Sequence, residues 1–460
     1  ALPYHFSLAE YEVMTVDPPR AARYMNLLLA LALAVVIYLF ASSLFGKEAG
    51  VLALALYCFS PNFIAHSSQA TLDLGVCLFT TASSLFFYLY HRYSSLHYLF
   101  CSAVALGLAI ASKFTALVAL GLLFLLLLFP EDLRVRGWGP FLRDLLILYL
   151  TAFLVFCASY RFQGCLRQQE VPFENAGLER LCYLFPDKAV EGITKKVMEG
   201  YEGADVYLFG SYSKQGFPYY YPVVFLAKTP LGTIVLLLLF LALLGYFARV
   251  RHTHRWFFHL YIALAFYSIP LQLVNRAQSG LRHLFPFYPF LFIALSSVML
   301  MLRDVEHERS KGILRAFIVL MVTSNAVVCL ASHPRELSYA NSIAWSLAED
   351  EFPLIGPDMD WGHADFLAEK VLERLPEDLP TYVNPRPYIA PKCGYIAVSC
   401  NCLLKHSPME IKPFDYLDPL EPIEEAGGVW LVYLNTEKGM LERAREHGDT
   451  RSEERRVGKE

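Results

Sequence analysis

Long runs of uncharged, apolar residues recur along the chain and predict its helices. A helix needs about 20 predominantly apolar residues to cross the roughly 30 Å hydrocarbon core of a bilayer, and runs of this length are present. We expect ten membrane-spanning helices, near residues 24–45, 50–66, 72–90, 97–112, 114–130, 143–160, 226–248, 256–275, 284–302 and 314–331. The pattern therefore predicts an all-α polytopic membrane protein.

Polar segments divide this apolar series and predict the parts that lie outside the bilayer. The expected order is an outer-face stub at 1–23, membrane helices 1–6 within 24–160, an outer-face loop with short helices at 161–222, membrane helices 7–10 within 223–331, a small outer-face α/β domain at 332–450 and a disordered tail at 451–460. In the loop, "DKAVEGITKKVMEGYEG" opens with an acid, which suits the positive end of a helix dipole. The α/β domain is predicted from a helical pattern at 363–375 and the strand-like runs "TYVN", "YIAVS" and "GVWLVYLN". The tail "RSEERRVGKE" resembles translated adaptor sequence and carries no function in this interpretation.

The positive charges in the short connections predict which ends of the helices face the cytoplasm. Cytoplasmic loops carry an excess of Lys and Arg. One set of loops holds twelve such residues: Lys47, Arg92, Arg134, Arg136, Arg143, Arg249, Arg251, Arg255, Arg303, Arg309, Lys311 and Arg315. The opposite set holds six: Arg20, Arg23, Lys113, Arg276, Arg282 and Arg335. We therefore expect the second set, the 161–222 loop and the C-terminal region on the outer face.

Composition agrees with a membrane protein and limits the other classes. The chain is 55% hydrophobic and 18% charged, and its net charge of −4 gives no indication of nucleic-acid binding. Five of its ten cysteines fall within apparent spans, and the remaining five, Cys165, Cys182, Cys393, Cys400 and Cys402, fall in polar segments. We expect a disulfide between Cys165 and Cys182 if their loop faces an oxidising compartment. The cysteine spacing does not match a zinc site, so no metal site is predicted, although dependence on a divalent metal stays open.

Several ionisable residues are expected at or just inside the outer ends of the spans. They are Asp73, Lys113, Lys228, Arg276, Arg282 and His283. Charges inside a bilayer are costly and tend to face cavities or partners, so their collection at one level indicates a shared wet cavity. Each also has a structural interpretation. Thr71 or Asp73 would cap the following helix, Lys113 would extend to the interface, and Arg282 and Lys228 would anchor their spans there.

Two further features favour a phosphate-bearing substrate in this cavity. Pro286 and Pro289 loosen the start of the span after Arg282 and His283, and free backbone N–H groups beside an arginine suit a phosphate. Tyr219, Tyr220 and Tyr221 form either an aromatic belt at the interface or a surface on which a sugar stacks. A carboxylate, several cations and aromatic rings on one face suit a lipid-linked, phosphate-bearing substrate that arrives from within the bilayer.

Five stretches resemble one known group of enzymes. They are "LFGKEAGVLALALYCFSPNFIAHSSQATLD", "GLAIASKFTAL", "YYYPVVFLAKTPLG", "LRHLFPFYPFLF" and "PDMDWGHADFLAEKVLERL", which occur in this order over about residues 24–375. The chain resembles the GT-C superfamily of integral-membrane glycosyltransferases, in the branch of protein O-mannosyltransferases and lipid A aminoarabinose transferases. The resemblance implies transfer of one sugar, usually with inversion, from a polyprenyl-phosphate donor to a protein, lipid or glycan acceptor. It also implies a bacterial inner membrane with the active site on the periplasmic or exterior side.

The resemblance assigns roles to particular residues. Asp73 matches the second acid of the family site, in the threonine-x-aspartate position. Lys113 and Arg282 lie in motifs whose cations engage the carrier phosphate, and Lys228 lies in the matching lysine-threonine-proline context. With the neighbouring cations, the candidate phosphate ligands are Lys113, Arg282, His283, Lys228 and Arg276. The "DMDW" stretch, Asp358–Trp361, matches a family pattern without an assigned chemistry.

The sequence departs from the family at its start. The first span and the acidic first outer loop, which supplies the base in the family, have no counterpart after Ala1. Glu10, Glu12 and Asp17 do not lie in a family motif. We therefore expect an N-terminally truncated chain that is inactive by itself. A transporter or flippase of a lipid-linked sugar is the alternative, since it would use the same cavity without a base, and a membrane scaffold is the third reading.

Overall fold

The computed structural model of the protein describes residues 20–127, 137–165, 182–203, 206–243, 276, 278, 280–348, 352–354, 358–359, 365–376, 379–384, 394–400, 417, 420–426 and 429–435. The expectations for the stub before Arg20, for the span at 256–275 and for the tail at 451–460 lie outside these ranges. The chain divides into two units, one formed by residues 17–206 and 213–333, the other by residues 1–16, 207–212 and 334–460.

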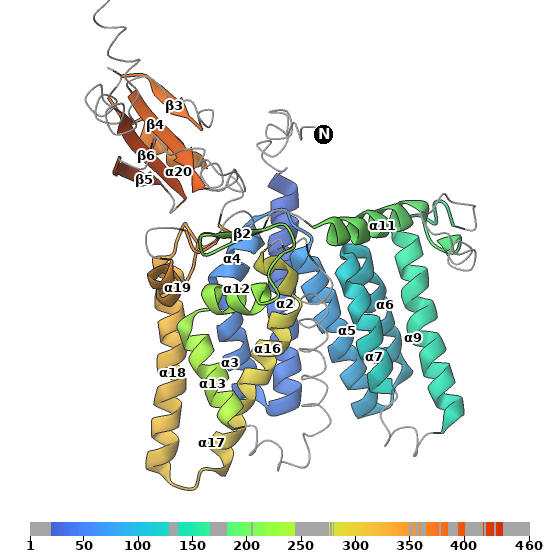
Figure 1. Cartoon of the computed structure of the whole chain (residues 1–460). Helices are drawn as coiled ribbons and strands as arrows, with labels where there is room; N and C mark the ends of the chain where they lie inside the picture. Colours follow the sequence, from blue (N-terminus) through green and yellow to red (C-terminus); the bar gives the residue numbers. More distant parts are fainter. Residues whose placement is uncertain are drawn as a thin grey trace, which may run out of the picture. The chain divides into compact units, whose positions relative to one another are not determined.

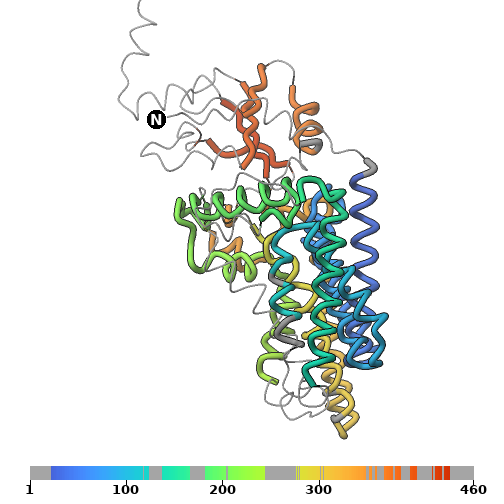
Figure 2. The backbone as a smooth tube through the Cα atoms, turned by 90° about the vertical axis from the view of Figure 1, so that its right-hand side faces the viewer, coloured from blue at the N-terminus to red at the C-terminus, as the bar shows by residue number. Residues whose placement is uncertain are grey.

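The larger unit is helical. Its elements are α2 (Arg20–Phe45), α3 (Lys47–Cys58), α4 (Pro61–Ser68), α5 (Asp73–Tyr93), α6 (Leu96–Ser112), η1 (Phe114–Ala116), α7 (Leu117–Leu127), α9 (Trp138–Ser159), α11 (Asp187–Glu202), α12 (Tyr220–Lys228), α13 (Leu231–Ala242), η2 (Leu281–Leu284), α16 (Phe287–Ser296), η3 (Ser297–Leu300), α17 (Met301–Asp304) and α18 (Glu308–Ala331). Two views show the long helices of this unit running along a common direction (Figures 1 and 2). Helices α11 and α12 cross that direction at one end of the bundle (Figure 1).

Four described helices are long and apolar enough to cross a membrane: α2 from Ala22, α5, α9 and α18. Two bent pairs, α3 with α4 and α12 with α13, also pass the test together, and each forms either a broken span or a re-entrant loop. Up to six spans are therefore found in the part of the chain that is described, and the expected number of ten stays a prediction. These apolar helices support an integral membrane protein.

The two breaks occur where proline follows a residue that leaves the helix. Helix α4 begins at Pro61 and bends by 64° from α3, while Pro230 precedes α13, which bends by 117° from α12. Proline cannot donate a backbone hydrogen bond within a helix, and it disfavours a helical conformation in the preceding residue. The predicted continuous spans at 50–66 and 226–248 are therefore wrong in this respect. The Ser60-Pro61 and Thr229-Pro230 pairs are the sequence signals that mark the breaks.

Small and polar residues hold the helices together. Ser83 of α5 and Ser102 of α6 exchange hydrogen bonds with each other's backbone carbonyls, at 2.9 and 2.8 Å. Asn325 of α18 donates to Thr233 of α13 at 2.8 Å. Such contacts are typical of helix packing in membranes. Because lipid tails are as apolar as the side chains, the hydrophobic effect does not drive helices together there, and interhelical hydrogen bonds and close packing do so instead.

The smaller unit contains α19 (Ser342–Leu347), α20 (Asp365–Leu372) and a sheet of β3 (Thr381–Val383), β4 (Gly394–Ser399), β5 (Pro422–Ala426) and β6 (Trp430–Asn435). The strand order is β3-β4-β6-β5, in which β3 pairs parallel with β4 and the other pairs are antiparallel. Its core contains Ile396, Val398, Leu417 and Tyr433. The three predicted strand-like runs correspond to β3, β4 and β6, whereas β5 was not predicted, because "PIEEA" lacks an apolar alternation. The outer-face position of this unit stays a prediction.

A hairpin of β1 (Val206–Leu208) and β2 (Ser211–Ser213) carries the chain from one unit to the other and back. Its two turn residues, Phe209 and Gly210, have φ angles of 44° and 77°. Two positive φ values in a two-residue connection are typical of a type I′ turn, whose twist matches that of the strands.

Candidate functional site

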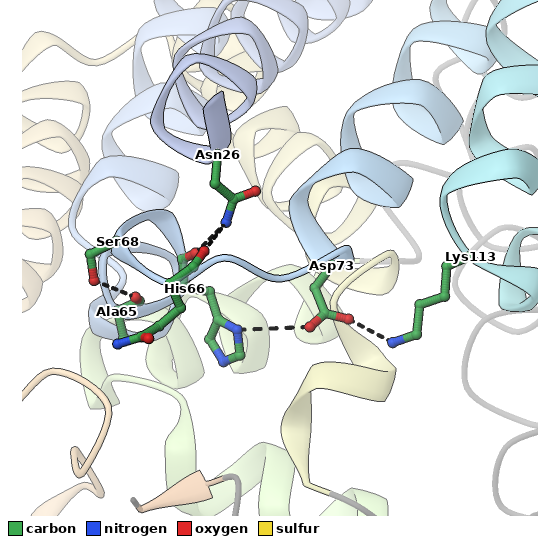
Figure 3. Close-up of polar contacts among 7 residues, drawn as sticks. Asn26, Ala65, His66, Ser68, Asp73 and Lys113 are labelled. Carbon is green, nitrogen blue, oxygen red and sulfur yellow. Dashed lines mark hydrogen bonds and ion pairs between the residues drawn. The ribbon is translucent and has the colours of Figure 1, made fainter. Parts of the chain in front are cut away.

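Asp73 lies in a buried polar cluster at one end of the helical unit. It is the first residue of α5, and only 3% of its surface is exposed. One carboxylate oxygen accepts a 2.6 Å hydrogen bond from the Lys113 ammonium, and the other lies 3.9 Å from Nδ1 of His66 (Figure 3). The helix cap is Leu72 and makes no side-chain hydrogen bond, so the expectation that Thr71 or Asp73 caps this helix is wrong.

The breaks in the chain place the partners of Asp73. Lys113 stands between α6 and η1 in extended backbone, so its side chain leaves the end of α6 toward α5. His66 lies in the last turn of the short helix α4, where its ring contacts Phe285 with centroids 4.4 Å apart. Asn26 of α2 donates to the His66 carbonyl at 2.8 Å and also to the carbonyl of Gln69 (Figure 3). These bonds use backbone acceptors that the end of α4 leaves free.

Further cations surround the same histidine. Besides Asp73, the charges of Lys228, Arg282 and Lys113 all act on His66. Lys228 ends α12 and is 1% exposed, and its carbonyl accepts a 2.7 Å hydrogen bond from Asn62 of α4. A cation in the last turn of a helix interacts favourably with the helix dipole. The structure thus brings four predicted site residues, Asp73, Lys113, Lys228 and Arg282, into one electrostatic neighbourhood.

His283 lies next to this neighbourhood and contacts one of the tyrosines. Its Nδ1 is 3.1 Å from the Tyr221 hydroxyl. Burial, together with the positive charges of Lys113, Arg282 and Lys196, holds the pKa of His283 well below its usual value. His283 is therefore neutral at physiological pH and can exchange hydrogen bonds with a hydroxyl but adds no charge to the site.

The other predicted residues are divided between the interior and the surface. Tyr220 and Tyr221 are 4% and 0% exposed, so the aromatic-belt interpretation is wrong for both, and only Tyr219, at 55%, has the exposure of a belt residue. The Tyr220 hydroxyl accepts a hydrogen bond from the Gly280 N–H and thereby supports the turn before Arg282.

Arg276 is exposed and stacks over the ring of Tyr201 at the end of α11, 6.0 Å from its centroid. The described contacts do not join Arg276 to the Asp73 cluster, and its phosphate role stays a prediction.

Sequence reasoning missed His66, Asn26 and Asn62. His66 lies only seven residues before Asp73, but the intervening segment leaves α4 before α5 begins, so no helical spacing relates the two. Within the described ranges, no group of three or more His, Cys, Asp or Glu residues could hold a metal ion. Asp358, the one "DMDW" acid that is described, is buried in the smaller unit.

The cysteines differ from the expectation. Cys165 and Cys182 are both free thiols in the structure, so the disulfide expected between them is not present in it. Of the other cysteines expected in polar segments, Cys400 is buried, and Cys393 and Cys402 lie outside the described residues.

Residues 12–158 match the sequence model of the dolichyl-phosphate-mannose-protein mannosyltransferase family. This segment includes Asn26, His66, Asp73 and Lys113, while Lys228 and Arg282 lie beyond it. For this segment the match confirms the predicted resemblance to the protein O-mannosyltransferase branch of the GT-C glycosyltransferases. No curated protein matches the chain significantly in sequence.

Solved structures with a similar arrangement were also found. ArnT from Cupriavidus metallidurans bound to undecaprenyl phosphate is 12% identical with a TM-score of 0.44, covering 94% of this chain and 87% of ArnT. Its apo form gives 12% identity and a TM-score of 0.41, with coverage of 94% and 86%. The Archaeoglobus fulgidus oligosaccharyltransferase, tethered to an acceptor peptide containing the NVT sequon, is 11% identical with a TM-score of 0.44, covering 79% of this chain and 50% of that enzyme.

Proposed function

With residues 12–158 taken as a segment of a lipid-linked-sugar transferase, we propose that the protein transfers one sugar from a polyprenyl-phosphate donor to an acceptor on the extracytoplasmic face of the membrane. The observation that carries the proposal is the buried carboxylate of Asp73, held by Lys113 and His66 where the charges of Lys228 and Arg282 converge. Buried ionisable groups in a membrane protein are costly and usually functional.

The charge of this cluster fits the chemistry of the reaction. A sugar linked to a polyprenyl phosphate is a phosphodiester with one negative charge, and the phosphate that leaves carries close to two at neutral pH. Three cations against the single carboxylate of Asp73 leave two positive charges around His66. A site of this charge stabilises the leaving phosphate more strongly than the bound donor, which lowers the barrier to transfer.

In this proposal the residues have distinct roles. Arg282, on the turn of η2, and Lys228, at the break between α12 and α13, hold the phosphate. Lys113 now pairs with Asp73, so a donor phosphate would compete with that carboxylate for the ammonium. The released Asp73 carboxylate orients the acceptor hydroxyl or amine, beside a base that the family carries in its first outer loop.

The proposal is tested with Asp73→Asn in the natural full-length chain, assayed in proteoliposomes for sugar transfer and for carrier binding. Transfer should fall by about 100-fold or more while the carrier still binds, because the amide keeps the shape but loses the negative charge. Unchanged transfer would overturn the assigned role of Asp73. If the wild-type protein moved the lipid-linked sugar across the bilayer without transferring it, the transporter alternative would replace the enzyme.

A further inference from the structure

Asp73 lies between two side chains that hold it unequally. Its Oδ1 accepts the 2.6 Å hydrogen bond of the Lys113 ammonium, whereas its Oδ2 lies 3.9 Å from Nδ1 of His66 (Figure 3). The first distance is that of a strong charge-assisted hydrogen bond, and the second is about 1 Å longer than a typical hydrogen bond. His66 is thus placed beside the carboxylate without yet donating to it.

The three side chains differ in their freedom to move. The side chain of Lys113 is 22% exposed, whereas those of Asp73 and His66 are each 5% exposed. A lysine carries its ammonium on a flexible four-carbon stem, so Lys113 can turn toward an incoming anion. Asp73 is enclosed at the first residue of α5, so bulk water does not reach it to replace a lost partner. A buried carboxylate that loses a hydrogen bond is costly, and a second donor beside it removes that cost.

The protein holds His66 where it can supply that donor. The buried Asn26 donates to the His66 carbonyl at 2.8 Å. The His66 ring lies edge-on against Phe285, with centroids 4.4 Å apart, and Phe285 stacks on Phe63 at 4.8 Å. The backbone and the ring are therefore both fixed. The carboxylate of Asp73 only accepts hydrogen bonds, so it favours the imidazole tautomer with the proton on Nδ1.

We propose that His66 is a positioning residue that takes over the Asp73 carboxylate when the donor phosphate draws Lys113 away. The inference rests on the proposed function, in which a phosphate competes with Asp73 for the ammonium. As Lys113 turns to the phosphate, the Nδ1–H of His66 donates to Oδ2 of Asp73. One hydrogen bond replaces another and no proton is transferred. The carboxylate stays ionised and aimed at the acceptor, so His66 acts through Asp73 rather than on the reacting atoms.

Two conservative variants test this role in the natural full-length chain, assayed for sugar transfer in proteoliposomes. The amide N–H of asparagine lies close to the position of Nδ1, whereas that of glutamine lies close to the position of Nε2. His66→Asn should keep kcat within about threefold of the wild type, and His66→Gln should lower it by about 10- to 100-fold with an unchanged KM for the donor. Equal kcat values for the two variants would overturn the proposal. The matched control is His97→Gln, an exposed histidine of α6, which should change neither constant.

A second experiment needs no transfer. Thermal unfolding in detergent is followed with undecaprenyl phosphate and, as the control, with undecaprenol, which lacks the phosphate. Double-mutant cycles combine Asp73→Asn with Lys113→Gln and with His66→Gln. On addition of undecaprenyl phosphate, the coupling of unfolding temperatures should decrease for Lys113 and increase for His66, whereas undecaprenol should change neither. A coupling between His66 and Asp73 that does not increase would refute the exchange of partners.

Failure of the proposed function gives a different result. If the couplings change as expected but no sugar is transferred, the role of His66 stands and the transferase proposal is wrong. If sugar is transferred while the couplings stay the same, only the exchange of partners is wrong. If undecaprenyl phosphate does not raise the unfolding temperature of the wild type more than undecaprenol does, both proposals are wrong.

Discussion

Asp73 and Lys113 form a 2.6 Å ion pair between the first residue of α5 and the residue that follows α6. Only 5% of the Asp73 side chain and 22% of the Lys113 side chain are exposed. The pair joins the ends of two neighbouring helices. It also holds the Asp73 carboxylate against an ammonium group to which a donor phosphate could bind instead. It therefore links the packing of the helices to the proposed chemistry.

Removing either member of this pair should destabilise the protein. Asp73→Ala leaves the Lys113 ammonium without its carboxylate partner, and Lys113→Ala leaves the Asp73 carboxylate without its ammonium partner. Each change should lower the free energy of unfolding by about 1–3 kcal/mol. The exposure of Lys113 keeps the cost below that of a fully buried pair. In a double-mutant cycle followed by thermal unfolding in detergent, the coupling should be about 0.5–3 kcal/mol. Additive single-variant effects would show that the two charges do not stabilise one another.

Arg282→Ala in the natural full-length chain should lose most of its transfer activity. A cation on the leaving phosphate acts mainly in the transition state, so kcat should fall by roughly 100-fold or more. The matched control is Arg309→Ala, an exposed arginine in the first turn of α18. Wild-type turnover of the Arg282 variant would remove this residue from the site.

The stability of the protein should decrease in mild acid through His283. Its pKa is lowered in the folded state, so the folded protein keeps it neutral while the unfolded chain protonates near pH 6.5. The contribution of His283 to the free energy of unfolding is fully present above that pH and decreases as the pH falls below it. The decrease is up to about 1.4 kcal/mol per pH unit, and it is smaller for a partly exposed ring. Thermal unfolding at pH 5 and pH 7 should show a smaller difference in His283→Asn than in the wild type. An identical difference would assign the acid sensitivity to other groups.

A side chain at Gly107 should destabilise the packing of α6 against α9. A Cβ added there would lie 2.6 Å from the Ala152 carbonyl oxygen and 2.7 Å from the Val155 Cβ, so α6 and α9 would have to separate. Gly107→Ala should lower stability by roughly 1–3 kcal/mol, measured by thermal unfolding in detergent. Gly139→Ala on α9 is the matched control, because an added Cβ meets nothing within 4 Å there. Equal unfolding temperatures for the two variants would contradict close packing at Gly107.

The structure also bears on the charge sets that predicted the orientation. Arg92 and Arg303, both of the predicted cytoplasmic set, each donate at 2.9 Å to a carbonyl at the end of α2, Ser43 and Phe45 respectively. Asn26, near the start of the same helix, contacts the segment of His66. Arg92 and Arg303 therefore lie at the end of α2 opposite to Asn26 and the His66 segment. Which end faces the cytoplasm stays a prediction.

The sequence by itself determined the helical membrane class, because uncharged runs of about 20 residues have no other favourable environment. It also identified Asp73, Lys113, Lys228 and Arg282, since charges beside such runs are conspicuous. It did not determine that α3 and α12 break before the ends of their apolar runs, although the prolines mark the positions. Nor did it determine that His66 faces Asp73 or that Tyr221 contacts His283. Those relationships depend on helix bends and chain reversals that bring distant residues together, and only the tertiary structure decides them.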